Sequence, residues 1–354
     1  MIKRVVLDGQ VFAGRHTGMY RYAYEILHEL DKIIDHEWID LIIPVGVKLE
    51  KEFKNIRVIE YGNNTGIFWT QTSLLWYCVT HRKIPFGFCN TTPVFKPGIV
   101  VVHDIGYKVL SKSYKNIYGK LSSLWHRLNY WIIARSGCPL ITVSETAKAE
   151  IMDVYRVSGN RMTVIGNGWQ HYERIKECDS VCDRFPQIMP NKYYFAIGSL
   201  EERKNFRWIL NVARNNPNEL FVIAGAAVKN ASDRLNDDGL DNVIKTGFVK
   251  DEEAKWLMKN AKAFLFPSTY EGFGIPPLEA LSVGTPVLCS NASCMPEICG
   301  DAVCYFDPYD YKVILDDMEC NDPVKVEKVL SKYSWKESAA KLKEFLLREE
   351  KRML

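Results

Sequence analysis

The sequence of 354 residues has ten cysteines but lacks any CxxC pair. Cys294, Cys299 and Cys304 follow one another at intervals of five residues, which suits neither a zinc knuckle nor a compact disulfide framework. The pattern excludes the common small metal-binding modules. We therefore expect free, mostly buried thiols in a reducing compartment and no metal site.

Long apolar runs are also lacking. No stretch approaches the roughly 20 consecutive apolar residues that a membrane-spanning helix requires. The chain begins MIKRVVLDG, and Asp8 ends the first apolar run before it could form the core of a signal peptide. We therefore expect a cytoplasmic protein. Contact with the cytoplasmic face of a membrane stays open as an alternative.

The chain has little net charge, +3, and so lacks the strong basic surplus typical of nucleic-acid-binding proteins. One segment is unusual, because no acidic residue occurs between Gly106 and Ser144. Basic and aromatic residues alternate there: Lys108, Lys112, Lys115, Lys120, Arg127 and Arg135 with Tyr107, Tyr114, Tyr118, Trp125, Tyr130 and Trp131. An amphipathic helix of this composition, over 107–137, suits an anionic membrane surface. A sheet-covering helix with a basic outer face is an equally good interpretation.

Short runs rich in valine and isoleucine alternate with helical patterns along the chain. The first half has predicted strands at 3–8, 40–45, 56–61, 99–104 and 140–145 and predicted helices at 18–31, 68–81, 113–136 and 146–155. A polar, irregular segment at 169–192 is interpreted as a linker. Further strands are predicted at 193–198, 220–225, 242–249, 263–268, 286–290 and 303–307. The alternation predicts two doubly wound, Rossmann-like α/β domains that face a central cleft.

The stretch PSTYEGFGIPPLEALSVGTP carries two glutamates, Glu271 and Glu279, around a glycine turn. Prolines after Ile275 predict the start of a helix, because proline is tolerated in the first turn. A helix N-terminus beside glycines is a phosphate-binding arrangement. Glu279 in the first turn could complement the helix dipole or reach the hydroxyls of a ribose. Glu271 precedes the helix, so the dipole does not explain it.

Three other segments offer candidate residues after predicted strands. In GSLEERKNF, Arg203 and Lys204 could clamp a diphosphate, although this segment taken alone favours a solvated loop with incidental charge. In IVVVHDIGY, His103 ends a buried strand, where it could hydrogen-bond a sugar or transfer a proton. In VFAGRHTGMYRYAYEIL, Gly14 and Gly18 flank a loop before a helix, but the GxGxxG pattern of dinucleotide-binding enzymes is absent.

Taken in order, these segments resemble the retaining glycosyltransferases of family 4, which have the GT-B fold. The resemblance covers nearly the whole chain, through TGMYRYAYEIL, VVVHDI, LITVSETAKAEI, VIGNG, AIGSLEERKN, the block from Thr246 to Pro308, and SWKESAAKL. It implies an acceptor-binding domain at 1–172, a donor-binding domain at 173–333 and a helix at 334–354 that crosses back onto the first domain. Gly166 stands where members often have a proline.

The resemblance also implies roles for individual residues. Glu271 would approach the donor sugar, His103 would contact it, and Arg203 and Lys204 would neutralise the diphosphate, so that neither a metal nor another cofactor is required. The implied donor-binding residues are Gly18, Gly198, Gly225, Val249, Gly272, Phe273, Gly274, Ile275 and Glu279. The reaction would be front-face attack with retention, in which the leaving phosphate accepts the proton of the acceptor.

The run EGFGIPPLEALSVGTPV with the later PEICGDAV looks like the subgroup of GDP-mannose-dependent mannosyltransferases that assemble surface polysaccharides, lipopolysaccharide included. We expect mannose transfer to a glycan or a polyprenyl-diphosphate-linked glycan. A UDP-sugar or GDP-fucose donor remains open. The alternatives are a sugar-nucleotide epimerase or phosphorylase of the same fold, and a non-enzymatic sugar-nucleotide-binding subunit of an assembly complex. A nicotinamide dehydrogenase is a weaker alternative, because the glycine fingerprint is missing.

Overall fold

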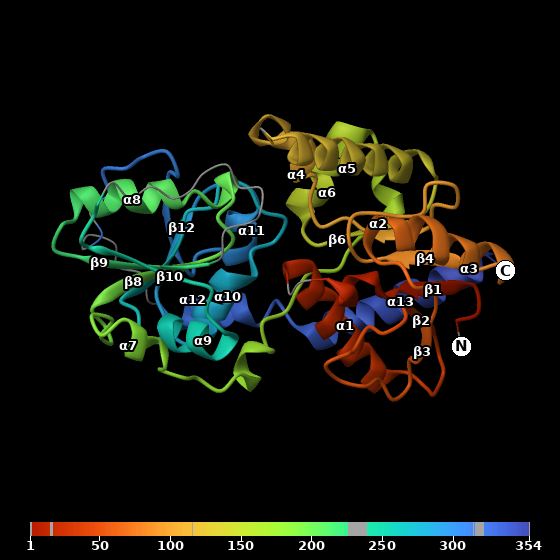
Figure 1. Ribbon diagram of the computed structural model, residues 1–354, viewed down its shortest axis with the longest axis horizontal. Helices are drawn as coiled ribbons and strands as arrows, with labels where there is room; N and C mark the ends of the chain where they lie inside the picture. The colour runs from red at the N-terminus through yellow and green to blue at the C-terminus, as the bar shows by residue number, and fades with distance from the viewer. Residues whose placement is uncertain are drawn as a thin grey trace. The chain divides into compact units, whose positions relative to one another are not determined.

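The computed structural model describes residues 2–14, 17–114, 116–225, 239–313, 315 and 322–353. The chain divides into two compact units (Figure 1). Unit 1 comprises Met1–Ser111, Leu121–Gly168 and Ser334–Leu354, and unit 2 comprises Lys112–Lys120 and Trp169–Tyr333. Each unit is a parallel sheet with its own helices.

Within the described residues, unit 1 contains a seven-stranded parallel sheet of order β3-β2-β1-β4-β5-β6-β7. Its strands are β1 Val5–Asp8, β2 Asp40–Ile43, β3 Arg57–Glu60, β4 Ile84–Gly87, β5 Ile99–Val101, β6 Leu140–Thr142 and β7 Met162–Val164. Its helices are α1 Gly18–Ile33, α2 Gly66–Trp69, α3 Leu75–Thr80, α4 Gly106–Val109, α5 Ile117–Arg135, α6 Glu145–Tyr155 and α13 Trp335–Met353. A π-helical turn at Thr70–Leu74 joins α2 to α3.

Unit 2 contains a six-stranded parallel sheet of order β10-β9-β8-β11-β12-β13 in the described ranges. Its strands are β8 Tyr193–Ile197, β9 Leu220–Ala224, β10 Val243–Gly247, β11 Ala263–Phe266, β12 Val287–Ser290 and β13 Cys304–Phe306. Its helices are α7 Val181–Arg184, α8 Phe206–Asn215, α9 Asp251–Lys259, α10 Ile275–Ser282, α11 Met295–Cys299 and α12 Pro323–Leu330. The strand order reverses direction between β8 and β11, so the loops after these two strands flank the topological switch point of the sheet.

Two strands were not predicted, and both had weak sequence signals. β4 has the sequence IPFG, and proline and glycine argue against a central strand. Pro85 nevertheless pairs with Val6 in the sheet register, and Phe86 behind it is fully buried. β7 has only three residues, Met162–Val164. The remaining strands lie within a few residues of their predicted bounds, and the prediction of two doubly wound α/β units is confirmed. The short helices α4 and α7 were not predicted, and α7 lies within the segment interpreted as a linker.

The interpretation of 169–192 as a linker is wrong. The segment is held on unit 2 along its length: Lys255 Nζ donates to the carbonyls of Tyr172 and Ile175, each at 2.8 Å, and Arg184 pairs with Glu253 at 2.7 Å. These hydrogen bonds satisfy an irregular backbone that has no sheet partners. Packing of this kind leaves no recognisable sequence period.

The boundary between the units also lies earlier than the expected residue 172. The indole of Trp169 donates to Leu330 O at 2.9 Å, and Gln170 donates to Tyr333 O at 2.9 Å, which places both residues in unit 2. The main part of unit 2 therefore begins at Trp169. Unit 2 also includes Lys112–Lys120, which the sequence analysis assigned to the first domain.

The C-terminal helix α13 packs against α1 in unit 1, which confirms the expected return of the chain to the first domain. Glu350 accepts hydrogen bonds from the backbone N–H groups of Lys3 and Arg4 at 2.9 and 3.1 Å. At the other end, Ser338 Oγ donates to Gly166 O at 2.7 Å. Both ends of the helix are thereby hydrogen-bonded to the first 168 residues.

Two expectations from composition can be compared with the structure. Cys78, Cys89, Cys138, Cys178, Cys182, Cys289, Cys294 and Cys299 are free thiols, whereas Cys304 is disulfide-bonded, so the expectation of ten free thiols is wrong for this residue. None of the helices in the described ranges combines the length and apolar character that crossing a membrane requires.

Candidate functional site

The loop between β11 and α10 lies at the carboxyl edge of the sheet in unit 2. Gly274 caps α10 with a φ of 96°, and a Cβ at this position would lie 2.4 Å from Met295 Cε, so only glycine fits without strain. Pro276 and Pro277 follow in the first turn, as predicted. Pro276 and Pro277 carry no N–H, so the backbone donors at the start of α10 are the N–H groups of Ile275 and Leu278. With the glycine turn beside them, they suit an anionic ligand.

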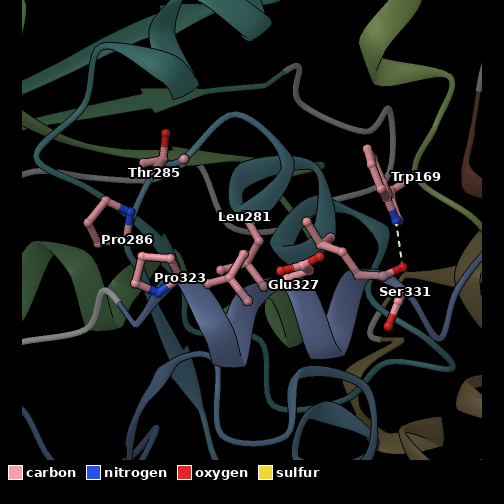
Figure 2. Close-up of a pocket in the computed structure, with 10 residues that line it drawn as sticks. Trp169, Leu281, Thr285, Pro286, Pro323, Glu327 and Ser331 are labelled. Atoms are coloured by element: carbon pink, nitrogen blue, oxygen red, sulfur yellow. Dashed lines mark hydrogen bonds between the residues drawn. The ribbon is translucent and has the colours of Figure 1, made fainter.

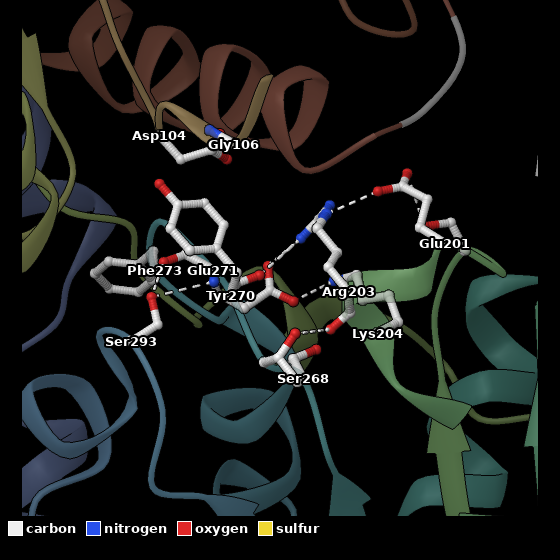
Figure 3. Close-up of polar contacts among 12 residues, drawn as sticks. Asp104, Gly106, Glu201, Arg203, Lys204, Ser268, Tyr270, Glu271, Phe273 and Ser293 are labelled. Carbon is white, nitrogen blue, oxygen red and sulfur yellow. Dashed lines mark hydrogen bonds and ion pairs between the residues drawn. The ribbon is translucent and has the colours of Figure 1, made fainter. Parts of the chain in front are cut away.

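Glu271 lies between two cations from the neighbouring loop after β8 (Figure 3). Its Oε1 is 2.6 Å from Lys204 Nζ, and its Oε2 is 2.7 Å from the guanidinium of Arg203. The same guanidinium donates through Nε to Glu201 Oε2 at 2.7 Å. We call Glu201, Arg203, Lys204 and Glu271 the Glu271 cluster. The sequence predicted that three of its members would come together, and missed Glu201.

The charge state of the cluster follows from burial and pairing. Burial of Glu271 acts to raise its pKa, but the nearby charges of Lys204 and Arg203, with hydrogen bonds from Lys204 and Ser268, outweigh it and lower the pKa to about 2. The carboxylate is therefore ionised at neutral pH. Its side chain is only 10% exposed, so the two ion pairs are largely shielded from solvent.

Backbone hydrogen bonds hold the two loops of the cluster together. Thr269 N donates to Arg203 O at 2.8 Å, which ties the loop after β11 to the loop after β8. Asn205, with a φ of 54°, donates from its amide to Pro267 O at 3.2 Å. Ser293 Oγ donates to Glu271 O at 2.8 Å from a third loop. The positions of Arg203, Lys204 and Glu271 are thus fixed by several elements.

Gly198 and Gly225 lie back to back at the same edge of the sheet. A Cβ on Gly225 would lie 1.8 Å from Gly198 O, and the φ of Gly225 is +148°, so no other residue fits there. Gly225 N also donates to Gly247 O at 2.8 Å. These contacts bring the ends of β8, β9 and β10 close to one another. Val249, also predicted as donor-binding, is buried in the loop before α9.

Glu279 is the fifth residue of α10, at the start of its second turn and close to the predicted position in or near the first turn. Its Oε1 is 2.7 Å from Nε2 of His171, a histidine that is 2% exposed. No local pattern could have indicated this pair, because 108 residues separate its members. Phe273, predicted as donor-binding, packs its ring edge-on against Tyr333 at 5.3 Å, so its side chain serves the core. Only the backbone of Phe273 is available at the glycine turn.

Unit 1 carries the two remaining candidates. Gly18 is the first residue of α1, next to the N-cap Thr17, and a Cβ on it would meet nothing within 4 Å. His103 follows β5, and its Nε2 lies 2.8 Å from Phe88 O. Because a carbonyl only accepts, Nε2 carries the proton and Nδ1 is the acceptor of the neutral ring. Burial lowers the pKa of His103, which favours this neutral form.

A pocket of about 540 Å³ lies elsewhere in unit 2, at the C-terminal end of α10 and beside α12 (Figure 2). Its lining is mainly apolar and includes Trp169, Leu281, Pro286, Pro323 and Leu330. The residues of the Glu271 cluster do not line it. Among the described residues, no group of three or more His, Cys, Asp or Glu side chains is placed to hold a metal ion.

Comparison with known proteins connects this geometry to a family. The sequence model of the family "Glycosyl transferases group 1" matches residues 184–319, which contain the whole Glu271 cluster. The chain is 32% identical over 193 residues to O-antigen chain mannosyltransferase B of Escherichia coli, and this match spans 49% of each protein. It is 24% identical to O-antigen chain mannosyltransferase RfbU of Salmonella typhimurium over 84% of each. The chain thus spans about half the length of the first of these relatives.

Solved structures confirm the fold. HepE of Anabaena, in a complex with UDP-glucose, superposes with a TM-score of 0.72 at 17% identity, covering 98% of this chain and 99% of its own. Sucrose-phosphate synthase of Thermosynechococcus elongatus gives 0.71 at 15% identity, covering 98% of each chain. The resemblance to glycosyltransferases inferred from the sequence is confirmed: residues 184–319 match the model of the glycosyl transferases group 1 family, and the chain has the two-domain GT-B fold.

Proposed function

We propose that the chain is a retaining glycosyltransferase that moves a hexosyl group from a nucleotide-sugar donor to a glycan or lipid-linked glycan acceptor in surface-polysaccharide synthesis. The Glu271 cluster carries this proposal. It places two cations and two carboxylates at the switch point of a parallel sheet, beside the glycine turn and the N-terminus of α10. Ligands of open α/β sheets bind at this edge. The group 1 family match covers the same residues.

In the proposed reaction the diphosphate of the donor binds to Arg203 and Lys204. Both cations are paired with Glu271 in the structure, so the diphosphate must compete with this carboxylate. A diphosphate carries more charge and more acceptor oxygens than a carboxylate, which favours the exchange. Glu271, displaced from the cations, then faces the sugar. N–H groups of the glycine turn and α10 add further donors for the phosphate oxygens.

The transfer step breaks the bond between the anomeric carbon and the phosphate oxygen and forms a bond to the acceptor oxygen on the same face. The leaving phosphate takes the proton of the acceptor hydroxyl. Arg203 and Lys204 stabilise the charge that develops on this phosphate, which is the main electrostatic demand of the transition state. Because two side-chain cations supply this charge, we propose that the reaction needs no metal ion. We propose that Nδ1 of His103, the acceptor of the neutral ring, accepts a hydrogen bond from a sugar hydroxyl.

We propose mannose from GDP-mannose as the donor, since both O-antigen relatives are named as mannosyltransferases. HepE, whose structure was solved with UDP-glucose, has the same fold and makes a UDP-sugar the alternative. Glu279 would bind the ribose, which requires that its Oε1 shares or leaves His171. Lys204 and Arg203 do not distinguish the two bases, so the donor must be measured.

The test is a thermal-shift series with GDP, UDP and ADP, each without metal and with EDTA, on the full chain. A ligand present at a hundredfold excess over its Kd stabilises the folded state by about 2.7 kcal/mol, which is readily measured. We expect GDP to stabilise the wild type and to lose this effect in Lys204→Gln. The matched control is Lys262→Gln, which breaks the ion pair with Glu219 elsewhere in unit 2.

If only UDP stabilises the protein, the proposed donor GDP-mannose is wrong and a UDP-sugar takes its place. A GDP effect that depends on added Mg²⁺ would contradict metal independence. Failure of all three nucleotides, in a protein that is folded, would contradict the transferase proposal and favour a different role for the Glu271 cluster. Retention is tested separately, from the anomeric configuration of the product by NMR.

A further inference from the structure

The helix α5 (Ile117–Arg135), yellow-green in Figure 1, has an inner face that covers the sheet of unit 1. Tyr130 and Ile133 of this face are 3% and 2% exposed and pack in one cluster with Val100 of β5 and Leu140 of β6. The interpretation of this segment as a sheet-covering helix is therefore correct for one face. It does not account for the opposite face.

The opposite face of α5 carries a stripe of large apolar side chains in contact with solvent. Its members are Ile117, Leu121, Leu124, Leu128 and Trp131, which are 80, 62, 62, 43 and 52% exposed. Their spacing alternates between four and three residues, so they lie on one side of the helix. We call them the α5 stripe. A water-facing helix of a globular protein normally has polar residues here, and contiguous apolar surface marks an interaction site.

The charged residues of α5 itself are all basic. Lys120 and Arg127 are exposed and, seven residues apart, follow one edge of the stripe, while exposed Arg135 follows its C-terminal end. The guanidinium of Arg135 lies 5.7 Å from the ring centre of Trp131. No acidic residue occurs between Gly106 and Ser144. The face is thus apolar along its centre and cationic at its margin.

We propose that the α5 stripe is the surface by which this protein lies on an anionic lipid bilayer. An amphipathic helix with apolar residues on one face and basic residues beside them lies in the plane of the lipid interface, with the apolar residues below the headgroups. Trp131 is a residue type that favours this boundary. Each cation near an anionic surface adds about 1 kcal/mol, roughly a fivefold gain in partitioning.

Charge argues against a second copy of the chain as the occupant. Helices that pair through a stripe with this spacing are normally steered by opposite charges at its edges. Here the edges of both copies would present Lys120 and Arg127, and α5 contains no acid to pair with them. Phosphate groups of anionic lipids supply the missing negative charge. The proposal concerns the surface of α5 and does not rest on the transfer reaction.

Vesicle flotation with the full chain tests the proposal. We expect the protein to float with vesicles of phosphatidylcholine and phosphatidylglycerol, and to bind pure phosphatidylcholine far more weakly. Leu121→Glu/Leu124→Glu/Leu128→Glu should lower the partition coefficient by about a hundredfold or more, because each leucine contributes apolar burial. The matched control is Val324→Glu on α12, where the valine is 75% exposed, and it should bind like the wild type.

The cations are tested by Lys120→Gln/Arg127→Gln/Arg135→Gln, which should lower binding to anionic vesicles by about a hundredfold at low salt. Nucleotide-induced stabilisation should be the same in all these variants as in the wild type, which shows that they are folded. Three results would each overturn the proposal. The wild type fails to bind anionic vesicles at low salt; the Val324→Glu control loses as much binding as the stripe variant; or the wild type is a dimer that the stripe variant disperses, without any vesicle binding.

Discussion

Removing the charge of Glu271 should destabilise the protein in a pH-dependent way. The substitution Glu271→Gln keeps the shape of the side chain but leaves Arg203 and Lys204 without the carboxylate that they contact at 2.6–2.7 Å. The pKa of Glu271 is lowered from 4.5 to about 2. This difference corresponds to about 3 kcal/mol of stability at pH 7. Because the side chain of Glu271 is only 10% exposed, solvent screens its two ion pairs little.

The sign of the pH dependence follows from the lowered pKa. The folded state holds the carboxylate ionised more strongly than the unfolded state does. Its contribution is therefore complete above about pH 5, falls to about 1.4 kcal/mol at pH 3, and vanishes below pH 2. The stability difference between wild type and Glu271→Gln should narrow along the same curve.

Urea denaturation of the full chain at pH 7, 5 and 3, followed by circular dichroism and tryptophan fluorescence, measures this difference. Glu219→Gln is the matched control, since Glu219 pairs with the single cation Lys262 and should contribute about 1 kcal/mol or less at pH 7. A Glu271→Gln effect no larger than that of the control, or one that stays constant from pH 7 to pH 3, would refute the reasoning.

Three further predictions concern single residues. Gly225→Ala should lower the free energy of unfolding by more than about 3 kcal/mol, because its Cβ would lie 1.8 Å from the carbonyl oxygen of Gly198. The control is Gly284→Ala in the same urea experiment. Gly284 has a φ of +80° but open space around it, so this substitution should lower the free energy of unfolding by only about 1 kcal/mol. The rate of sugar transfer by the wild type should stay constant as the pH falls from 8 to 6.5 and should decline only below pH 6.5. The reason is that burial lowers the pKa of His103 and keeps its ring neutral. A decline centred above pH 6.5 would contradict this. His103→Gln should abolish that acid limb. Glu201→Gln should raise the donor KM about fivefold with kcat within about twofold, since Glu201 only orients Arg203 through its Nε, and an equal loss in kcat would indicate a direct role.

The glycine turn and the start of α10 could be predicted from the sequence because their causes are local. Proline fixes φ in the first helical turn, and Gly274 provides the left-handed conformation at the cap. The proximity of Arg203 to Glu271 was also predictable. Strands β8 and β11 were recognised as buried parallel strands, and the carboxyl ends of such strands meet at one edge.

The sequence analysis missed the partners of several site residues, and one of these partners had a local signal. His171, which holds Glu279, comes from a segment without periodicity that is fixed by hydrogen bonds to unit 2. Glu201 was available from the sequence, since a carboxylate two residues before Arg203 is a local ion-pair signal. Phe273 was assigned to the donor site, but its ring packs against Tyr333.

The sequence by itself determined the alternation of strands and helices, and with it the two parallel sheets, because periodicity and burial of apolar runs are local properties of the chain. It also determined which residues follow which strand. Only the tertiary structure decided that Glu271 forms ion pairs with both Arg203 and Lys204. It also decided that one apolar face of α5 covers the sheet while the other faces solvent. The physical reason is that both facts depend on contacts between residues far apart in the chain. The sequence shows where the apolar residues of α5 lie, but not which of them another element covers.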